Sequence, residues 1–429
     1  MLGAALSVQR WVKGLYFGWW VLSGTIAFQI LTSVFLMQSY GAYVAVMEKE
    51  FSWSKTTFAV AFAVQQAGGG VIGPFQGWLL QRLGPQLVIR LGLGFLAGGL
   101  MALSQVTNLL SFYLAILLLA LGGSLAGFLS TNTVAVYWFQ RWRSTALALL
   151  QTGISIGGLL VPLVAWSLAT HGWRSTAFAS GLLALFIGLP LTFLIQNQPE
   201  DRGLLPDGAH HPPQRRPGEN GTPTEAPQRD FSAYEALRTR AFWLIGFGHA
   251  LALTVVFAVV NHLVLHLTTD LGFSLQRAAA MVALMTSFAI AGQLLGGLLG
   301  DYFDKRILAT AAMAGHATAL LCLAFGTTQL WVVAFCVVHG LAWGLRGPIM
   351  QSLRADYFGR AAFAQIMGFS IAIVTLGIVT GPILAGALAD QTGSYRLAFT
   401  ILAGLAILGS GFFLFATKPV PPAAGSEAT

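Results

Sequence analysis

Long apolar stretches alternate with short polar connections along the whole chain. Most are 20 or more residues long, enough for an α-helix to cross about 30 Å of hydrocarbon. The pattern therefore predicts an all-α membrane protein with twelve transmembrane helices, the fold class expected here. The predicted spans are residues 16–46, 56–80, 87–106, 111–138, 145–169, 175–196, 241–268, 276–300, 307–326, 330–357, 362–389 and 397–417.

A polar segment divides the predicted spans into two groups of six. Residues 197–240 are rich in proline, glycine and charge, which is typical of a flexible linker. We therefore expect an N-terminal six-helix bundle over residues 1–196, and a C-terminal bundle with a short disordered tail over residues 241–429.

The two groups of six repeat one another in sequence. Three pairs of segments correspond, and all are displaced by 219 to 222 residues. Two pseudo-symmetric bundles around a midplane site are typical of a carrier that works by alternating access. The pairs are GWLLQRLGPQ from Gly77 with GLLGDYFDKR from Gly297, residues 138–141 with 357–360, and residues 172–178 with 393–399.

Composition and charge narrow the class of protein further. Only 9% of the residues are charged, against roughly 25% in soluble domains. The formal charge of +8 is spread over helix ends rather than over one basic face, which argues against nucleic-acid binding. The larger share of Lys and Arg lies beside the termini and the linker, so we expect these in the cytoplasm and the protein in the inner membrane.

Motifs for chemistry at a bound cofactor or nucleotide are missing from the sequence. It has no phosphate-cradling loop and no hydrolase triad, so we expect neither an enzyme nor an ATP-driven pump, and no cofactor. The energy for transport should then come from a gradient of solute or protons.

The repeated loop segments resemble the loop signature of the major facilitator superfamily, and the resemblance covers essentially the whole chain. In that family the loop gates the cytoplasmic side through charge pairs and a helix terminus. The alternative is that these residues only form tight turns. The matching residues are Gly77, Arg82 and Gly84 in the first copy, where Gln81 replaces the acid, and Gly297, Asp301, Lys305 and Arg306 in the second.

A narrower resemblance is to bacterial monocarboxylate porters and oxalate/formate antiporters. It rests on YFGWW from Tyr16, SYGAYVAVMEKEFSWSKTTFAVAF from Ser39 and NHLVLHLTTDLGFS from Asn261. The resemblance implies a small organic anion as substrate. These branches are expected to carry a key arginine in the eighth helix, whereas the only arginine of the eighth span here is Arg277, at its outer edge.

Arg346 lies near the middle of the tenth span, and no acidic residue lies at that depth in any span. A guanidinium there costs at least a few kcal/mol unless it faces a wet cavity or a partner. An anionic substrate could supply that partner through two parallel hydrogen bonds. The alternative is an arginine bound to backbone carbonyls at a helix break, since Gly347 and Pro348 follow.

His339, Trp343 and Arg346 are spaced to share one face of the tenth helix. We expect that face to line the substrate cavity. His339 could accept a proton during transport, because imidazole titrates near neutral pH; the alternative is a hydrogen-bonded packing residue.

The seventh span contributes three histidines and Asn261. His249 and His262 are candidates, with His339, for carrying a proton. The spacing of His262 and His266 would suit two zinc ligands, but the sequence positions no further ligand, so we expect no metal site.

By the family resemblance, the first, fourth, seventh and tenth helices line the cavity. This adds Gln29, Tyr40 and Asn132 to Asn261 as candidates for substrate contact, with hydrogen bonding between helices as the alternative for each.

Together these features predict a monomeric secondary carrier for a small organic anion, with a proton as candidate co-substrate. One rival is an exporter of drugs or other metabolites, which would ordinarily need an acid within the membrane. The other is a non-transporting sensor or scaffold, for which a long structured cytoplasmic domain would be expected.

Overall fold

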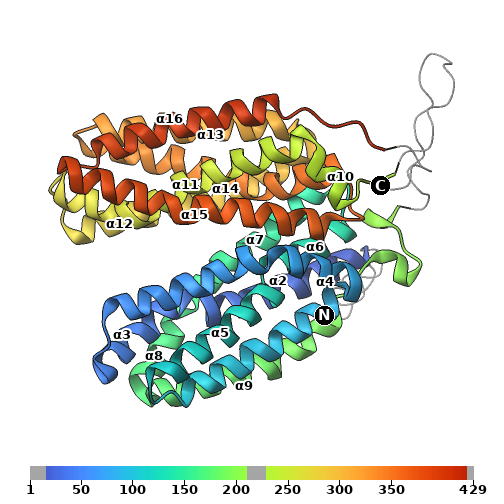
Figure 1. Ribbon diagram of the computed structural model, residues 1–429, viewed down its shortest axis with the longest axis horizontal. Helices are drawn as coiled ribbons and strands as arrows, with labels where there is room; N and C mark the ends of the chain where they lie inside the picture. Colours follow the sequence, from blue (N-terminus) through green and yellow to red (C-terminus); the bar gives the residue numbers. More distant parts are fainter. Residues whose placement is uncertain (1–15, 210–228, 423–429) are drawn as a thin grey trace, which may run out of the picture.

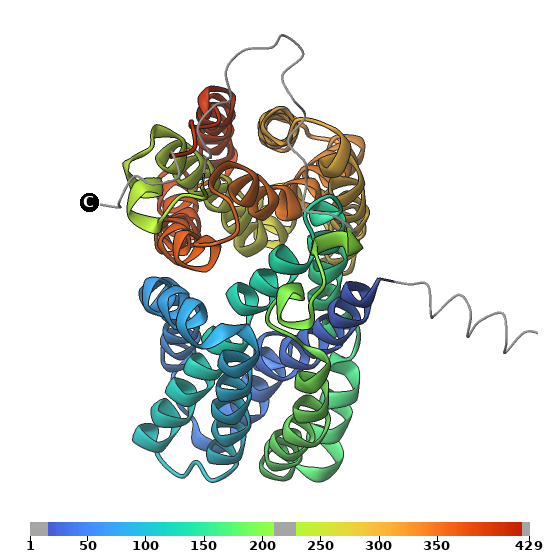
Figure 2. The same ribbon diagram turned by 90° about the vertical axis from the view of Figure 1, so that its right-hand side faces the viewer.

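The computed structural model describes residues 16–209 and 229–422, and within these ranges all regular structure is helical. Two helical bundles lie side by side, as Figures 1 and 2 show. The first contains α2 (Phe17–Thr32), the π-helical turn η1 (Ser33–Gln38), α3 (Tyr40–Phe51), α4 (Lys55–Ser104), α5 (Leu109–Ala126), α6 (Phe128–Trp138), α7 (Arg143–Leu159), α8 (Val161–His171) and α9 (Trp173–Leu194). The second contains α11 (Arg240–Thr269), α12 (Leu275–Tyr302), α13 (Lys305–Phe325), α14 (Gln329–Phe358), α15 (Phe363–Thr392) and α16 (Arg396–Phe415).

Helix α4 supplies two membrane crossings. Its 50 residues would form a straight helix about 75 Å long, far more than one bilayer needs. The chain turns at Gly84, where φ is +76°, and Pro85 begins the next helix. Of the described chain, eleven stretches are long and apolar enough to span a membrane, and one of them passes through Gly84. Counting that stretch as two confirms the twelve predicted helices.

Short 3₁₀ and α-helical turns connect the bundles. These are η2 (Pro199–Arg202), η3 (Pro206–Gly208) and α10 (Ala233–Arg238). They lie at the end of the molecule that also carries the C-terminal segment, which we call the linker end; the opposite end, at α3 and α8, is the far end (Figure 1).

The two bundles meet through close backbone contacts near the linker end. In α4 and α15, Gly73 and Gly368 face one another so closely that a β-carbon on either would collide with the carbonyl oxygen of the other. Gly77 is packed in the same way against Ala364. The ribbons separate toward the far end (Figure 1). Small residues at such crossings let helices approach closely.

Candidate functional site

Arg346 is buried in α14 and only 1% exposed. Its Nε and Nη1 atoms have no hydrogen-bond partner among the described residues. Helix α14 continues through Gly347 and Pro348 to Phe358, so the helix break required by the alternative interpretation does not occur there. The guanidinium is therefore left with unused donors, which is costly unless a partner arrives.

Two glutamines with unused polar atoms contact the next residue along α14, Gly347. Gln151 of α7 lies against Gly347, across the contact between the bundles, and its Nε2 has no partner within the described chain. Gln351 donates from Nε2 to the Gly347 carbonyl at 3.1 Å, but its Oε1 has none. Buried polar groups are normally hydrogen-bonded, so unused donors and acceptors at one contact point to a polar ligand.

A second buried arginine lies two turns further along α14. Arg354 is 1% exposed and donates to the Met350 carbonyl at 2.9 Å and to Ser370 Oγ at 3.1 Å. Its Nη2 lies 3.2 Å from His249 Nδ1. All three partners are uncharged when His249 is neutral. No Asp or Glu among the described residues is buried. Sequence reasoning missed Arg354, although a second arginine in one span was a visible signal.

His339 faces α13, inside the second bundle. Its Nδ1 lies 3.2 Å from Nδ1 of His316, and both side chains are fully buried. The Nε2 atoms of both rings have no partner among the described residues. Trp343 is half-buried and packs against the apolar core of the second bundle. The structure thus pairs His339 with His316, which sequence reasoning did not single out.

The four polar candidates lie in different places. Gln29 accepts a hydrogen bond from Thr131 of α6 at 2.8 Å. Asn132 is also buried; it donates to a carbonyl of its own helix, and its Oδ1 has no partner in the described chain. Tyr40 donates to the Phe58 carbonyl at 2.7 Å in the far half of the first bundle. Asn261 is exposed on α11.

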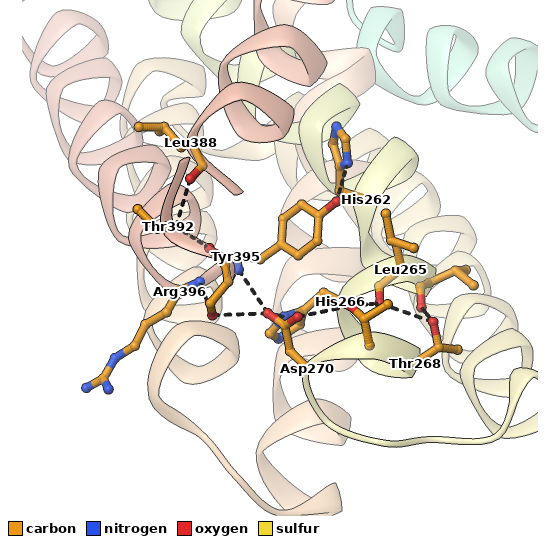
Figure 3. Close-up of polar contacts among 12 residues, drawn as sticks. His262, Leu265, His266, Thr268, Asp270, Leu388, Thr392, Tyr395 and Arg396 are labelled. Carbon is orange, nitrogen blue, oxygen red and sulfur yellow. Dashed lines mark hydrogen bonds and ion pairs between the residues drawn. The ribbon is translucent and has the colours of Figure 1, made fainter. Parts of the chain in front are cut away.

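The histidines at the far end of α11 tie that helix to the turn before α16 (Figure 3). His262 contacts the Tyr395 hydroxyl through Nδ1 at 3.0 Å and the Pro382 carbonyl through Nε2 at 2.9 Å. His266 Nδ1 lies 3.0 Å from Asp270 Oδ2. Partial burial raises the pKa of Asp270, but hydrogen bonds from the Tyr395 N–H and from His266 outweigh it and lower that pKa.

No group of three potential metal ligands occurs anywhere in the described ranges. Figure 3 shows the two histidines contacting different partners. The arrangement fits a structural clasp between helices, because His262 joins α11 to α15 and to Tyr395, and Asp270, which contacts His266, accepts from the Tyr395 N–H.

The second copy of the loop signature contacts the opposite bundle. Asp301 accepts hydrogen bonds from the backbone N–H groups of Ser144 at 2.8 Å and Thr145 at 3.1 Å, in the first turn of α7. A carboxylate at a helix N-terminus is stabilised by the helix dipole as well as by these bonds. Gly297 packs against Ala148 and Thr145 of α7 with no room for a side chain.

A three-residue charge network extends this contact. Asp356 lies 2.5 Å from Arg143 of the first bundle and 2.5 Å from Lys305 of the second. Arg306 lies 3.8 Å from Asp304, outside this network.

The first copy of the signature keeps the packing but lacks the carboxylate. Gly77 packs against Ala364 and Gln365 at the start of α15, just as Gly297 packs at the start of α7. Gln81, at the position equivalent to Asp301, is exposed. Arg82 stacks over the Trp78 ring at 4.9 Å, and Gly84 forms the turn described above.

Two linker aspartates bind equivalent loops of the two bundles. Asp207 accepts from the N–H groups of Gln140 at 2.9 Å and Arg141 at 2.6 Å. Asp230 accepts from those of Arg360 at 2.9 Å and Ala361 at 3.0 Å. Residues 210–228 of the expected flexible linker, 197–240, lie outside the described ranges.

The Arg360 side chain also links the bundles. It pairs with Glu200 of the linker and donates to the Tyr137 carbonyl of α6 at 3.1 Å. This contact was not predicted from the sequence.

Relatives of known name align over nearly the full chain. Rat monocarboxylate transporter 13 is 27% identical, over 92% of this chain and 89% of its own length. Human monocarboxylate transporter 11 is 28% identical, over 94% and 84%. The hexuronate transporter of Escherichia coli K12 is 24% identical, over 94% of both chains.

Solved structures share the fold. The transporter FucP, described as being in the outward conformation, superposes with a TM-score of 0.72 at 15% identity, covering 93% of this chain and 99% of that one. The human organic anion transporter MFSD10 gives 0.69 at 15% identity, covering 92% and 98%. The family model for the Major Facilitator Superfamily matches residues 26–345 and 242–429. The chain is therefore a multi-pass membrane protein that belongs to the major facilitator superfamily of transporters.

Proposed function

We propose that this protein is a secondary carrier of a small organic anion, such as a monocarboxylate. The observation that carries the proposal is the buried Arg346 guanidinium with unused donors, in a protein whose described residues include no buried acid. A carboxylate would satisfy the guanidinium through two parallel hydrogen bonds. The named relatives include carriers of monocarboxylates and hexuronates, which agrees with this substrate class.

The substrate would bind between the bundles, with Arg346 holding its negative group. Gln151, across the contact from α14, would bind a second polar group of the solute. Trp343 and His339 remain candidates on α14, and Gln29, Asn132, Tyr40 and Asn261 candidates for contacts as the bundles rearrange. His249, His262 and His339 remain the proton-carrier candidates.

Alternating access would come from rocking of the two bundles. The contact of Asp301 with the start of α7 and the Asp356 network join the bundles at the linker end, and these contacts would break when that end opens. The gate would comprise Gly77, Arg82, Gly84, Gly297, Asp301, Lys305 and Arg306. From the distribution of Lys and Arg, the linker end and both termini would face the cytoplasm in the inner membrane, and the carrier would act as a monomer.

The direct test is uptake by purified protein in liposomes. Radiolabelled lactate, pyruvate and glucuronate serve as probes, with the wild type, Arg346→Gln and the control Arg277→Gln, which alters an exposed arginine at the far end of α12. We expect uptake of at least one probe by the wild type and the control, and none by Arg346→Gln. Equal uptake by Arg346→Gln, or no uptake of any probe by the wild type, would contradict the proposal.

A further inference from the structure

The two imidazoles buried between α13 and α14 have the geometry of a pair that shares a proton. Their Nδ1 atoms are 3.2 Å apart, and each ring is fully buried. In the neutral pair one Nδ1–H donates to the other Nδ1, so the donating ring has a free lone pair at Nε2. Both Nε2 atoms are without partners in the described chain. His316 and His339 can therefore accept one more proton without breaking their mutual hydrogen bond.

The charge nearest to this pair along α14 is Arg346. It follows His339 by seven residues, about 10 Å along the axis and on nearly the same face. A positive charge on the guanidinium opposes a second one on the imidazoles. An anion on the guanidinium would cancel that opposition.

Other charged or titratable groups around the pair are few. On α11, His249 faces Arg354 of α14, further toward the linker end. Helices α7, α12 and α16 carry their charged residues only at their ends. Because no acid is buried among the described residues, no other group can supply the compensating negative charge.

We infer that the His316–His339 pair is the proton site of the carrier, and that it is occupied only while an anion lies on Arg346. This inference rests on the proposed function. A proton would pass from the solution to the free Nε2 lone pair after the anion binds, and would leave with it. Transport of a monoanion would then be electroneutral, with one proton moving per anion.

The test separates proton coupling from anion binding. His316→Leu removes the ring that shares a hydrogen bond with Nδ1 of His339, so a proton taken up by the remaining imidazole would be buried without an acceptor. The control is His171→Leu, which alters an exposed histidine at the far end of α8. Each protein in liposomes is assayed with labelled lactate, both for exchange at equal pH and for accumulation driven by a pH gradient.

In the wild type and the control, lactate should accumulate about tenfold per pH unit of gradient, which is the proton ratio itself. His316→Leu should exchange lactate at a near-normal rate but accumulate none. Accumulation by His316→Leu equal to that of the wild type would overturn the inference, because a packing role alone leaves coupling intact. If the wild type itself did not exchange lactate, the proposed function would be refuted instead.

A second measurement does not depend on how the variants fold. Lactate is added to unbuffered wild-type protein in detergent, and proton uptake is followed with a pH indicator. We expect one proton taken up per lactate bound, and no uptake on adding lactamide. Lactate binding without proton uptake would overturn the inference even if His316→Leu is unstable.

Discussion

Removing the Asp301 carboxylate should open the linker end of the molecule. Asp301 accepts from two N–H groups at the start of α7, at 2.8 and 3.1 Å, and these bonds join the two bundles. Hydrogen bonds to a charged acceptor at a helix N-terminus together contribute about 2 kcal/mol. They exist only while the linker end is closed, so Asp301→Ala should raise the ratio of open to closed molecules about 30-fold.

Distances between spin labels would measure that ratio. Cysteines replacing Arg141 and Tyr302 place labels at exposed positions of the two bundles at the linker end, in a background in which Cys322 and Cys336 are alanine. The wild-type background should give mainly a short distance. In Asp301→Ala the population at a longer distance should increase, and the population at the short distance should decrease.

The first bundle offers a matched control at Gln81, the exposed equivalent of Asp301. Gln81→Ala should leave the distances unchanged, because it removes no carboxylate from a helix end. Gln81→Asp should favour the short distance, because it places a carboxylate near the start of α15. Identical distance distributions for Asp301→Ala and Gln81→Ala would refute the reasoning.

Two further predictions concern the linker. Arg360→Gln removes the ion pair with Glu200 and the hydrogen bond to the Tyr137 carbonyl. The loss of roughly 1 kcal/mol should raise the fraction of open molecules about fivefold. A spin-label distance that does not change at low salt would contradict this prediction. The hydrogen bond from Arg229 lowers the pKa of Glu235 to about 2. A carboxyl with a lowered pKa stabilises the fold above its unfolded-state pKa and loses that effect as pH falls. In thermal unfolding, the difference in stability between the wild type and Glu235→Gln should therefore narrow as the pH falls from 5 to about 2. A constant difference would contradict this prediction.

The sequence predicted the membrane spans because lipid demands long apolar helices, whatever their neighbours. The internal repeat also located the loop segments that contact the opposite bundle, including the absence of a carboxylate at Gln81. The sequence could not show that His339 faces His316, because depth along a span does not say which neighbouring helix a side chain contacts. The contact of Asp207 with the first bundle could not be predicted for a similar reason: its partners are backbone N–H groups, which carry no signal in the sequence.

Arg354 marks another limit of sequence reasoning. Its guanidinium is satisfied by a serine, a carbonyl and His249 from three helices of the second bundle, whereas two nitrogens of Arg346 have no such partners among the described residues. Both arginines look alike in a hydropathy pattern. Only the folded arrangement shows which one has donors left for a ligand.

The most direct test of the central claim is the affinity of the purified protein for lactate and for its uncharged analogue lactamide, measured by calorimetry with and without Arg346. The account predicts that the wild type prefers lactate and that Arg346→Gln loses about 2 kcal/mol of lactate affinity, roughly 30-fold, and with it the preference. An undiminished preference for lactate in Arg346→Gln would show that this guanidinium does not bind the anion.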